Sequence, residues 1–160
     1  MSRRKSRIRR KIMVIGAGRS GKTSLVNALN DYHGPLRKTQ DMIFGKYTID
    51  VPGSYLENPW MYKHLISAAQ NNAGHILILV DQSNVTEIYS PGFARVFRCP
   101  VTGVIMKADL HPENRAICEK QLKNIGVEPP YFPVSLTENT GLEELKDHLR
   151  ELMIEREEDR

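Results

Sequence analysis

The stretch that decides the fold of this 160-residue chain reads Gly16-Ala17-Gly18-Arg19-Ser20-Gly21-Lys22-Thr23. It follows a mostly apolar segment, Lys11–Ile15, which predicts a short strand, and it opens a segment over Gly21–Leu29 that predicts a helix. The stretch has the form GxxxxGK[ST], in which glycines let backbone N–H groups surround a phosphate without Cβ atoms in the way. The helix that follows adds the positive end of its dipole. The sequence therefore predicts a phosphate-binding P-loop here.

We expect every residue of this loop, and Ser24 after it, to contact a bound nucleotide. Lys22 is the expected catalytic cation on the β- and γ-phosphates, and the Thr23 hydroxyl is an expected Mg²⁺ ligand. The same glycines also satisfy GxGxxG, which is typical of dinucleotide-binding folds. That alternative requires an acidic residue about 20 positions on. Asp41 is only loosely placed for it, and the Lys-Thr pair has no function there.

The rest of the chain alternates short apolar runs with longer segments of helical period, which predicts an α/β fold with a mostly parallel sheet. The expected strands are Lys11–Ile15, Tyr47–Val51, His75–Asp81, Val101–Met106 and Tyr131–Ser135, with one weak, antiparallel edge strand near Met42–Gly45. The expected helices are Gly21–Leu29, Pro59–Asn71, Pro112–Ile125 and Gly141–Met153. Thr140 and Glu143 have the spacing of a capping box at the last of these helices.

The charge of the chain is concentrated at one end. Seven of its 23 basic residues lie in the first 11 positions, where there is no acidic residue, and the remainder carries a net charge of −3. We therefore expect a basic flexible extension over residues 1–10, a single P-loop domain over 11–154 and a charged, frayed end over 155–160. A body this mildly acidic gives no reason to expect DNA binding.

No apolar run approaches the roughly 20 residues that span a bilayer, so we expect no integral membrane association. Cys99 and Cys118 have no paired spacing, which is typical of a reduced cytoplasm. The partner of the basic extension stays open. A solubilising arm is the simplest interpretation, and docking on an acidic protein surface, an anionic lipid or RNA are the alternatives.

Two further motifs suggest a nucleotide-sensing site. The DxxG sequence Asp50-Val51-Pro52-Gly53 ends a predicted strand, so Asp50 would hold Mg²⁺ through water and the Gly53 N–H would face the γ-phosphate. An ordinary turn is the alternative, because Asp, Pro and Gly are all common in turns. Thr39 lies in the polar connection where a second hydroxyl sensing Mg²⁺ and γ-phosphate is expected, although a lone loop threonine is usually only solvated.

Base recognition is expected at the sequence Met106-Lys107-Ala108-Asp109, which follows a predicted strand in the position of the guanine-specific motif NKxD. Asp109 would accept from the guanine N1–H and amine, and the stem of Lys107 would cover the ring. Met106 stands where that motif has Asn, which removes a polar tie to the P-loop. The alternative is a surface Lys-x-Asp that closes a strand. Ser135 and Leu136 lie at the end of the last predicted strand, where a backbone contact to the base is expected.

Taken together, these residues resemble the EutP/PduV family, small P-loop GTPase-like proteins of ethanolamine and propanediol utilisation. The resemblance spans Lys11 to about Leu152 and rests on Gly18–Leu25, Lys38–Gln40, Asp50–Asn58 with Tyr62, Ser90–Phe93, Gly103–Leu110 and Asn139–Leu142. It implies a three-layer Ras-like P-loop fold and a role beside bacterial microcompartments. It also implies that phosphotransfer to acetate or a similar short carboxylate is an alternative activity.

Two departures from the family bear on mechanism. Ser54 stands after DxPG, where family members often carry Glu and Ras-like proteins place a water-orienting Gln, and serine is too short for that task. We therefore expect slow GTP hydrolysis, of the order of 10⁻⁴–10⁻³ s⁻¹ without a partner. The basic extension is also longer than usual, which weakens a direct transfer of shell targeting from the family to this chain.

The sequence as a whole predicts a cytoplasmic, Mg²⁺-dependent protein that binds GTP and GDP and acts as a switch or assembly factor for a metabolic microcompartment. The expected partners are the guanine nucleotide and a shell or shell-associated protein. The alternative is a kinase that uses ATP or GTP to phosphorylate a short carboxylate.

Overall fold

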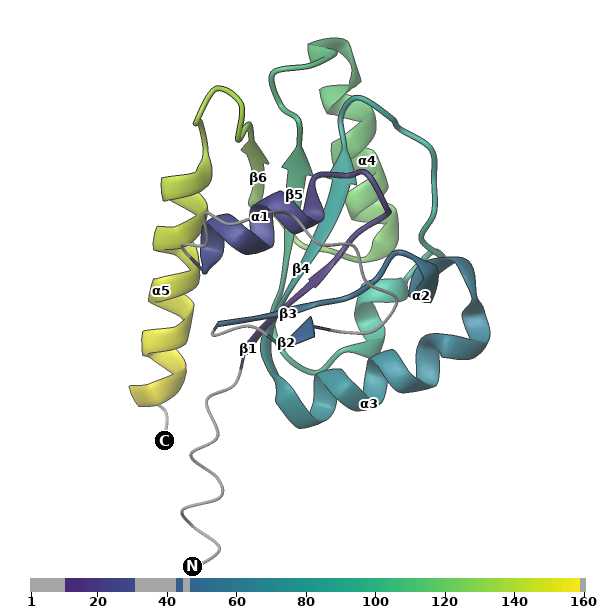
Figure 1. The fold of residues 1–160 in the computed structure, drawn as a ribbon, viewed down its shortest axis with the longest axis vertical. Helices are drawn as coiled ribbons and strands as arrows, with labels where there is room; N and C mark the ends of the chain where they lie inside the picture. Colours follow the sequence, from purple (N-terminus) through teal and green to yellow (C-terminus); the bar gives the residue numbers. More distant parts are fainter. Residues whose placement is uncertain (1–10, 31–42, 45–46, 159–160) are drawn as a thin grey trace, which may run out of the picture.

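The computed structural model of the chain describes residues 11–30, 43–44 and 47–158 (Figure 1). The predicted sensor Thr39 lies outside these residues. The strands are β1 (Lys11–Ile15), β2 (Ile43–Phe44), β3 (Thr48–Asp50), β4 (Ala73–Asp81), β5 (Val101–Met106) and β6 (Tyr131–Val134). The α-helices are α1 (Lys22–Leu29), α2 (Ser54–Glu57), α3 (Tyr62–Asn72), α4 (Arg115–Ile125) and α5 (Leu142–Glu158). Short 3₁₀ helices occupy Pro59–Met61, Phe93–Val96 and Pro112–Asn114.

The strands form one sheet in the order β2-β3-β1-β4-β5-β6. Strands β3, β1, β4, β5 and β6 run parallel to their neighbours, whereas the two-residue β2 pairs antiparallel with β3. In this order β3, the parallel neighbour that follows β1 in the chain, lies on one side of β1, and β4 lies on its other side. The carboxyl end of β1 is therefore a topological switch point, where open α/β sheets bind their ligands.

The alternating side chains of β1 explain the three layers. Met13 and Ile15 face a core shared with α3 and α4, and Ile12 and Val14 face a second core shared with α1 and α5. Figure 1 shows α1 and α5 on one side of the sheet and α3 and α4 on the other. Apolar burial on both faces explains why the central strands read as continuous apolar runs.

The predicted helices form with shifted ends. The helix expected from Pro59 begins as the 3₁₀ turn and continues as α3, and α5 runs past the predicted Met153 to Glu158. The capping box expected at α5 is wrong. Gly141 accepts the first helical bond, from the Leu145 N–H, while the backbone of Thr140 exchanges hydrogen bonds with Ser135 in a β-bridge.

Helix α2 was not predicted, because Pro52-Gly53 followed by a serine has the composition of a turn. Its single turn follows directly from the DxxG motif, with the Leu56 N–H bonded to the Gly53 carbonyl. Within the described part of the chain, no helix is both long and apolar enough to cross a membrane.

Candidate nucleotide-binding site

The predicted P-loop connects β1 to α1 at the switch point of the sheet. The Ser20 hydroxyl donates to the Ala17 carbonyl across 2.7 Å, which closes the loop on itself. Arg19 and Gly21 adopt positive φ angles of 68° and 91°, and Gly21 caps α1. The loop is thus a compact turn at a helix N-terminus, the geometry in which backbone N–H groups bind phosphate.

Lys22, the first residue of α1, points to the end of β3. Its ammonium lies 2.7 Å from Asp50 Oδ1, and both side chains are more than nine-tenths buried. A buried ion pair of this kind costs about 3–5 kcal/mol when one partner is removed. The two charged groups predicted for phosphate and metal therefore hold each other, and a bound phosphate would have to compete with Asp50 for Lys22.

Gly53, the last residue of the DxxG motif, lies directly against the P-loop. A Cβ at this position would stand 2.6 Å from the Gly18 N, closer than atoms can approach. Glycine is thus required here by contact with the loop rather than by its own φ, which is an ordinary −57°. The predicted γ-phosphate sensor and the predicted phosphate loop are in van der Waals contact.

The residues expected to bind Mg²⁺ have suitable chemistry, because the Thr23 hydroxyl and the Asp50 carboxylate are hard oxygen donors. Thr23 and Ser24 lie in the first turn of α1, beside Lys22, and both side chains are half-buried. Lys22 contacts Oδ1 of Asp50, and the same carboxylate has a second oxygen. The donor set therefore fits a magnesium ion.

Lys107 follows β5 and reaches the P-loop. Its ammonium donates to the Arg19 carbonyl across 2.6 Å and to Asp81 Oδ2 across 3.0 Å. Lys107 itself adopts a φ of 57°, which is uncommon for a residue with a side chain. The predicted base-contacting loop is thus tied to the predicted phosphate loop by a charge-assisted bond.

Asp109 is oriented from β6. Its Oδ1 accepts from the Ser135 hydroxyl across 2.9 Å, and the same hydroxyl accepts from the Glu138 N–H. Ser135 is 1% exposed, so this bond is shielded from water. The sequence predicted a backbone contact from Ser135, and the bond from its side chain to Asp109 was missed. Leu136 is half-buried and packs against the core beneath α1 and α5.

Met106 makes an apolar contact with the P-loop, at the position where the NKxD motif has a polar tie. Its methyl group lies 3.2 Å from where a Gly21 Cβ would stand, and its side chain is 2% exposed. The β5 loop and the P-loop are therefore packed together at Met106 and hydrogen-bonded together at Lys107.

A residue that the sequence did not single out organises this region. Gln82 is fully buried directly after β4, and its side-chain amide donates to the carbonyls of Ala108 and Leu110. The polar run Asp81-Gln82-Ser83 after a buried strand was the available signal. A role for it could not be assigned without knowing that β4 and β5 are neighbours.

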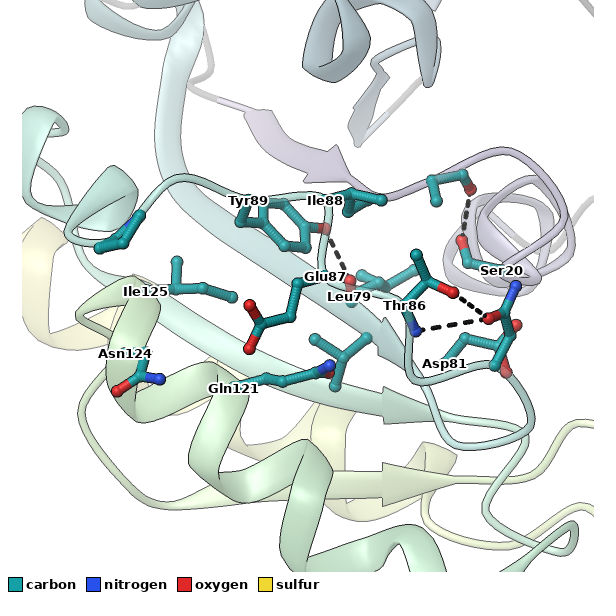
Figure 2. Close-up of a pocket in the computed structure, with 14 residues that line it drawn as sticks. Ser20, Leu79, Asp81, Thr86, Glu87, Ile88, Tyr89, Gln121, Asn124 and Ile125 are labelled. Carbon is teal, nitrogen blue, oxygen red and sulfur yellow. Dashed lines mark hydrogen bonds between the residues drawn. The ribbon is translucent and has the colours of Figure 1, made fainter.

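A cavity of about 60 Å³ lies beside the P-loop, between the end of β4 and α4 (Figure 2). Its walls include the acidic side chains of Asp81 and Glu87, and Figure 2 shows the Glu87 carboxylate between Ile125 and Gln121. Tyr89 also lines the cavity, and its hydroxyl donates to the Leu79 carbonyl across 2.6 Å. Burial raises the pKa of this hydroxyl well above its usual range, so it stays a donor.

Two solved structures with the same fold are associated with guanine nucleotides, one by its name and one by its bound GTP analogue. The chain superposes on a probable GTP-binding protein, engB, with a TM-score of 0.69 at 18% identity, covering 91% of this chain and 99% of that one. It also superposes on translation elongation factor SelB from Methanococcus maripaludis, solved with the GTP analogue GppNHp. There the TM-score is 0.63 at 21% identity, covering 91% of this chain and 34% of the factor. At these identities the likeness shows a parallel-sheet α/β fold shared with P-loop GTPases.

Curated relatives are more similar to this chain in sequence than these solved structures are. Propanediol utilization protein PduV of Citrobacter freundii is 35% identical over 137 residues, covering 85% of this chain and 90% of the relative. The probable acetate kinase EutP of Escherichia coli (strain K12) is 32% identical over 148 residues, covering 89% and 91%. The family model for ethanolamine utilisation and propanediol utilisation matches residues 9–151. With its P-loop, its DxxG strand end and its Lys-Ala-Asp loop gathered at one edge of the sheet, the chain belongs to the PduV–EutP family.

Proposed function

We propose that this P-loop NTPase of propanediol or ethanolamine utilisation is specific for guanine nucleotides and binds them with Mg²⁺. The observation that carries the proposal is the Asp109 carboxylate, which a buried Ser135 hydroxyl holds at the edge of the sheet. A fixed carboxylate accepts from the N1–H and amine of guanine, and it faces the wrong groups of adenine. The Lys107 ammonium donates to the Arg19 carbonyl and so links the base loop to the phosphate loop.

The phosphate side of the site supports a Mg²⁺-dependent reaction. When Lys22 moves from Asp50 to the β- and γ-phosphates, the Asp50 carboxylate becomes free to hold the hydrated metal beside Thr23. A metal ion held by these residues would supply positive charge to the phosphates. Gly53 lies against the P-loop, where its N–H would respond to the γ-phosphate.

Hydrolysis by the isolated chain is slow in this proposal. Ser54 opens α2 immediately after Gly53, and its hydroxyl is too short to orient an attacking water as a longer amide does. Turnover stays near 10⁻⁴–10⁻³ s⁻¹ unless a partner supplies the missing groups. A rate well above about 1 s⁻¹ for the purified protein would contradict this part of the proposal.

A slow hydrolytic cycle suits a switch or assembly factor for a metabolic microcompartment in the cytoplasm. The support is that one relative is named for propanediol utilisation and that Gly53 and Asp50 both contact P-loop residues, so a bound γ-phosphate would act directly on these contacts. In this proposal the domain occupies residues 11–154, a shell or shell-associated protein reads the change, and Thr39 is the second metal sensor.

Phosphorylation of a short carboxylate is the second candidate, because relatives that cover most of the chain are named probable acetate kinase. The cavity beside the P-loop is a natural place for a small substrate, but its walls carry Asp81 and Glu87. Asp81 is paired with Lys107, but the Glu87 carboxylate would repel a carboxylate substrate, so this geometry favours the first candidate over the second.

Calorimetric titration of the purified protein with GTP, GDP and ATP, each with and without Mg²⁺, tests the proposal. Lys22→Met removes the phosphate contact and serves as the negative control, with exposed Lys120→Met on α4 as the matched change. Mg²⁺-dependent GTP binding at least about tenfold tighter than ATP binding is the expected result, because a paired Asp109 contact is worth roughly 1.5–3 kcal/mol.

Equal or tighter ATP binding would contradict guanine specificity. The next assay would then be acetate phosphorylation, followed by release of acetyl phosphate. Formation of acetyl phosphate at a rate that depends on Lys22 would establish the kinase in place of the switch.

A further inference from the structure

Gln82 is completely buried and makes an unusually full set of hydrogen bonds. Its backbone N–H donates to the Met106 carbonyl across 3.0 Å, which extends the pairing of β4 with β5 by one residue. Its side-chain Nε2 donates to the carbonyls of Ala108 and Leu110, at 3.0 and 2.7 Å. These two carbonyls flank Asp109, the residue proposed to read the base.

The acceptor side of Gln82 is also occupied. Its Oε1 accepts from the Arg115 Nε across 2.6 Å, and its backbone carbonyl accepts from Asn114 Nδ2 across 3.0 Å. Arg115 opens α4, so the start of that helix holds Gln82 in one orientation. A bond from a charged donor is stronger than a neutral one, and it fixes which end of the amide faces the loop.

The loop that Gln82 holds cannot keep its shape by itself. Lys107 is in the left-handed region at a φ of 57°, and His111 follows at 48°. Such conformations cost of order 1–3 kcal/mol each and persist only where surrounding contacts impose them. The bonds from Gln82 lie between these two positions and supply that constraint from a neighbouring strand.

From this arrangement we infer that Gln82, oriented by Arg115, is a positioning residue for base recognition. It sets the backbone on both sides of Asp109 and so determines affinity and selectivity for the guanine ring. The inference rests on the proposed function. Only an amide serves both sides, because the loop carbonyls need two N–H donors and Arg115 needs an oxygen acceptor.

The test measures binding of GDP and of pyrophosphate to the full chain and its Gln82→Met variant. Methionine keeps the volume and loses every side-chain hydrogen bond. GDP binding should weaken about tenfold, while pyrophosphate binding, which uses only the P-loop, should change by less than about twofold. A role in stability alone would weaken both ligands by the same factor.

Gln121→Met is the matched control. Gln121 is 8% exposed on α4 and donates to the Val85 carbonyl, away from the base loop. It should leave the ratio of GDP to pyrophosphate affinity unchanged within about twofold. Gln82→Glu, which keeps an acceptor for Arg115 but lacks the donors, should behave like Gln82→Met. Arg115→Lys should weaken GDP by a smaller factor, about threefold.

A double-variant cycle decides whether Gln82 acts through Asp109. In an Asp109→Ala background, Gln82→Met should change GDP affinity by less than about twofold. A full tenfold loss in that background, or equal losses for GDP and pyrophosphate, would overturn the inference while leaving guanine specificity in place. A wild-type chain that binds GDP no more tightly than ADP would overturn the proposed function, and the inference with it.

Discussion

The base side and the phosphate side of the candidate site differ in the partners to which their polar groups are bonded. On the base side, each group is held by the framework: Asp109 by Ser135, and Lys107 by Asp81 at the end of β4. On the phosphate side, the predicted phosphate ligand Lys22 is bound to the predicted metal ligand Asp50, and Gly53 rests on Gly18.

This difference suggests that one side recognises the base and the other changes when phosphate binds. A base side fixed by the fold can recognise guanine without rearrangement, so the energy of base binding is not spent on ordering the loop. A phosphate side whose groups hold each other must open before Mg²⁺ and phosphate can be bound. Opening at that side is the event to which a partner protein could respond.

The strongest test of the phosphate side is Asp50→Asn. Asp50 competes with phosphate for Lys22, so its neutralisation should raise GDP affinity in the presence of a chelator about tenfold. The same change removes the metal ligand, so added Mg²⁺ should no longer increase affinity for GTP. Titration of GDP and GTP with EDTA and with Mg²⁺ measures both effects. If the chelated affinity falls instead, the ion pair does not compete with nucleotide.

Asp109→Asn is the corresponding test of the base side. An amide in place of the carboxylate offers a donor to the base, which matches the carbonyl at position 2 of xanthine and mismatches the guanine amine. We expect GDP affinity to fall roughly 10–100-fold and xanthosine diphosphate affinity to rise. Competition against a fluorescent guanine nucleotide measures both. Unchanged preference would mean that Asp109 does not contact the base.

The sequence predicted most of the fold because its main signals are local. The apolar runs of β1, β4 and β5 and the P-loop are each recognisable within ten residues, and the parallel order brings their carboxyl ends together. The single turn of α2 was missed because Pro52 and Gly53, directly before it, have turn composition.

The missed parts of the site depend on neighbours that are distant in sequence. Gln82 acts on residues 26 and 28 positions away, and the Ser135 hydroxyl acts on a residue 26 positions away. The partner that Lys22 takes, Asp50, lies 28 positions on. Motifs indicated which residues belong to the site, but which of them bind each other depends on strand order and on burial.

Gly53→Ala tests whether the contact between the DxxG motif and the P-loop changes with nucleotide. A Cβ would stand 2.6 Å from the Gly18 N, so the two segments must move apart at a cost of about 1–3 kcal/mol. If nucleotide binding separates them, that cost should be smaller with a GTP analogue and Mg²⁺ bound. Urea unfolding with and without the analogue measures the two differences. Equal destabilisation in both conditions would mean that Gly53 stays on the P-loop throughout.

Substitution of Tyr89 tests how firmly the ends of β1 and β4 are held beneath the candidate site. Its hydroxyl donates to the Leu79 carbonyl at the end of β4 and lies 3.3 Å from the Ile15 carbonyl at the end of β1. Tyr89→Phe should therefore lower the free energy of unfolding at neutral pH by about 0.5–1.5 kcal/mol.

The effect of Tyr89→Phe should also depend on pH, because burial raises the Tyr89 pKa above its unfolded value near 10. Above that pH the unfolded chain loses the proton first. The wild type then loses stability at up to about 1.4 kcal/mol per pH unit from this group, and the variant does not. Unfolding curves of the two proteins should therefore converge between pH 10 and about 11. Tyr131, whose pKa is also raised by burial, is present in both proteins and cancels from the difference. Parallel pH profiles would mean that Tyr89 ionises as freely in the folded chain as in the unfolded one. The strand ends beneath the P-loop would then be open to solvent, and the fixed base side would lack the rigid support that this comparison assigns to it.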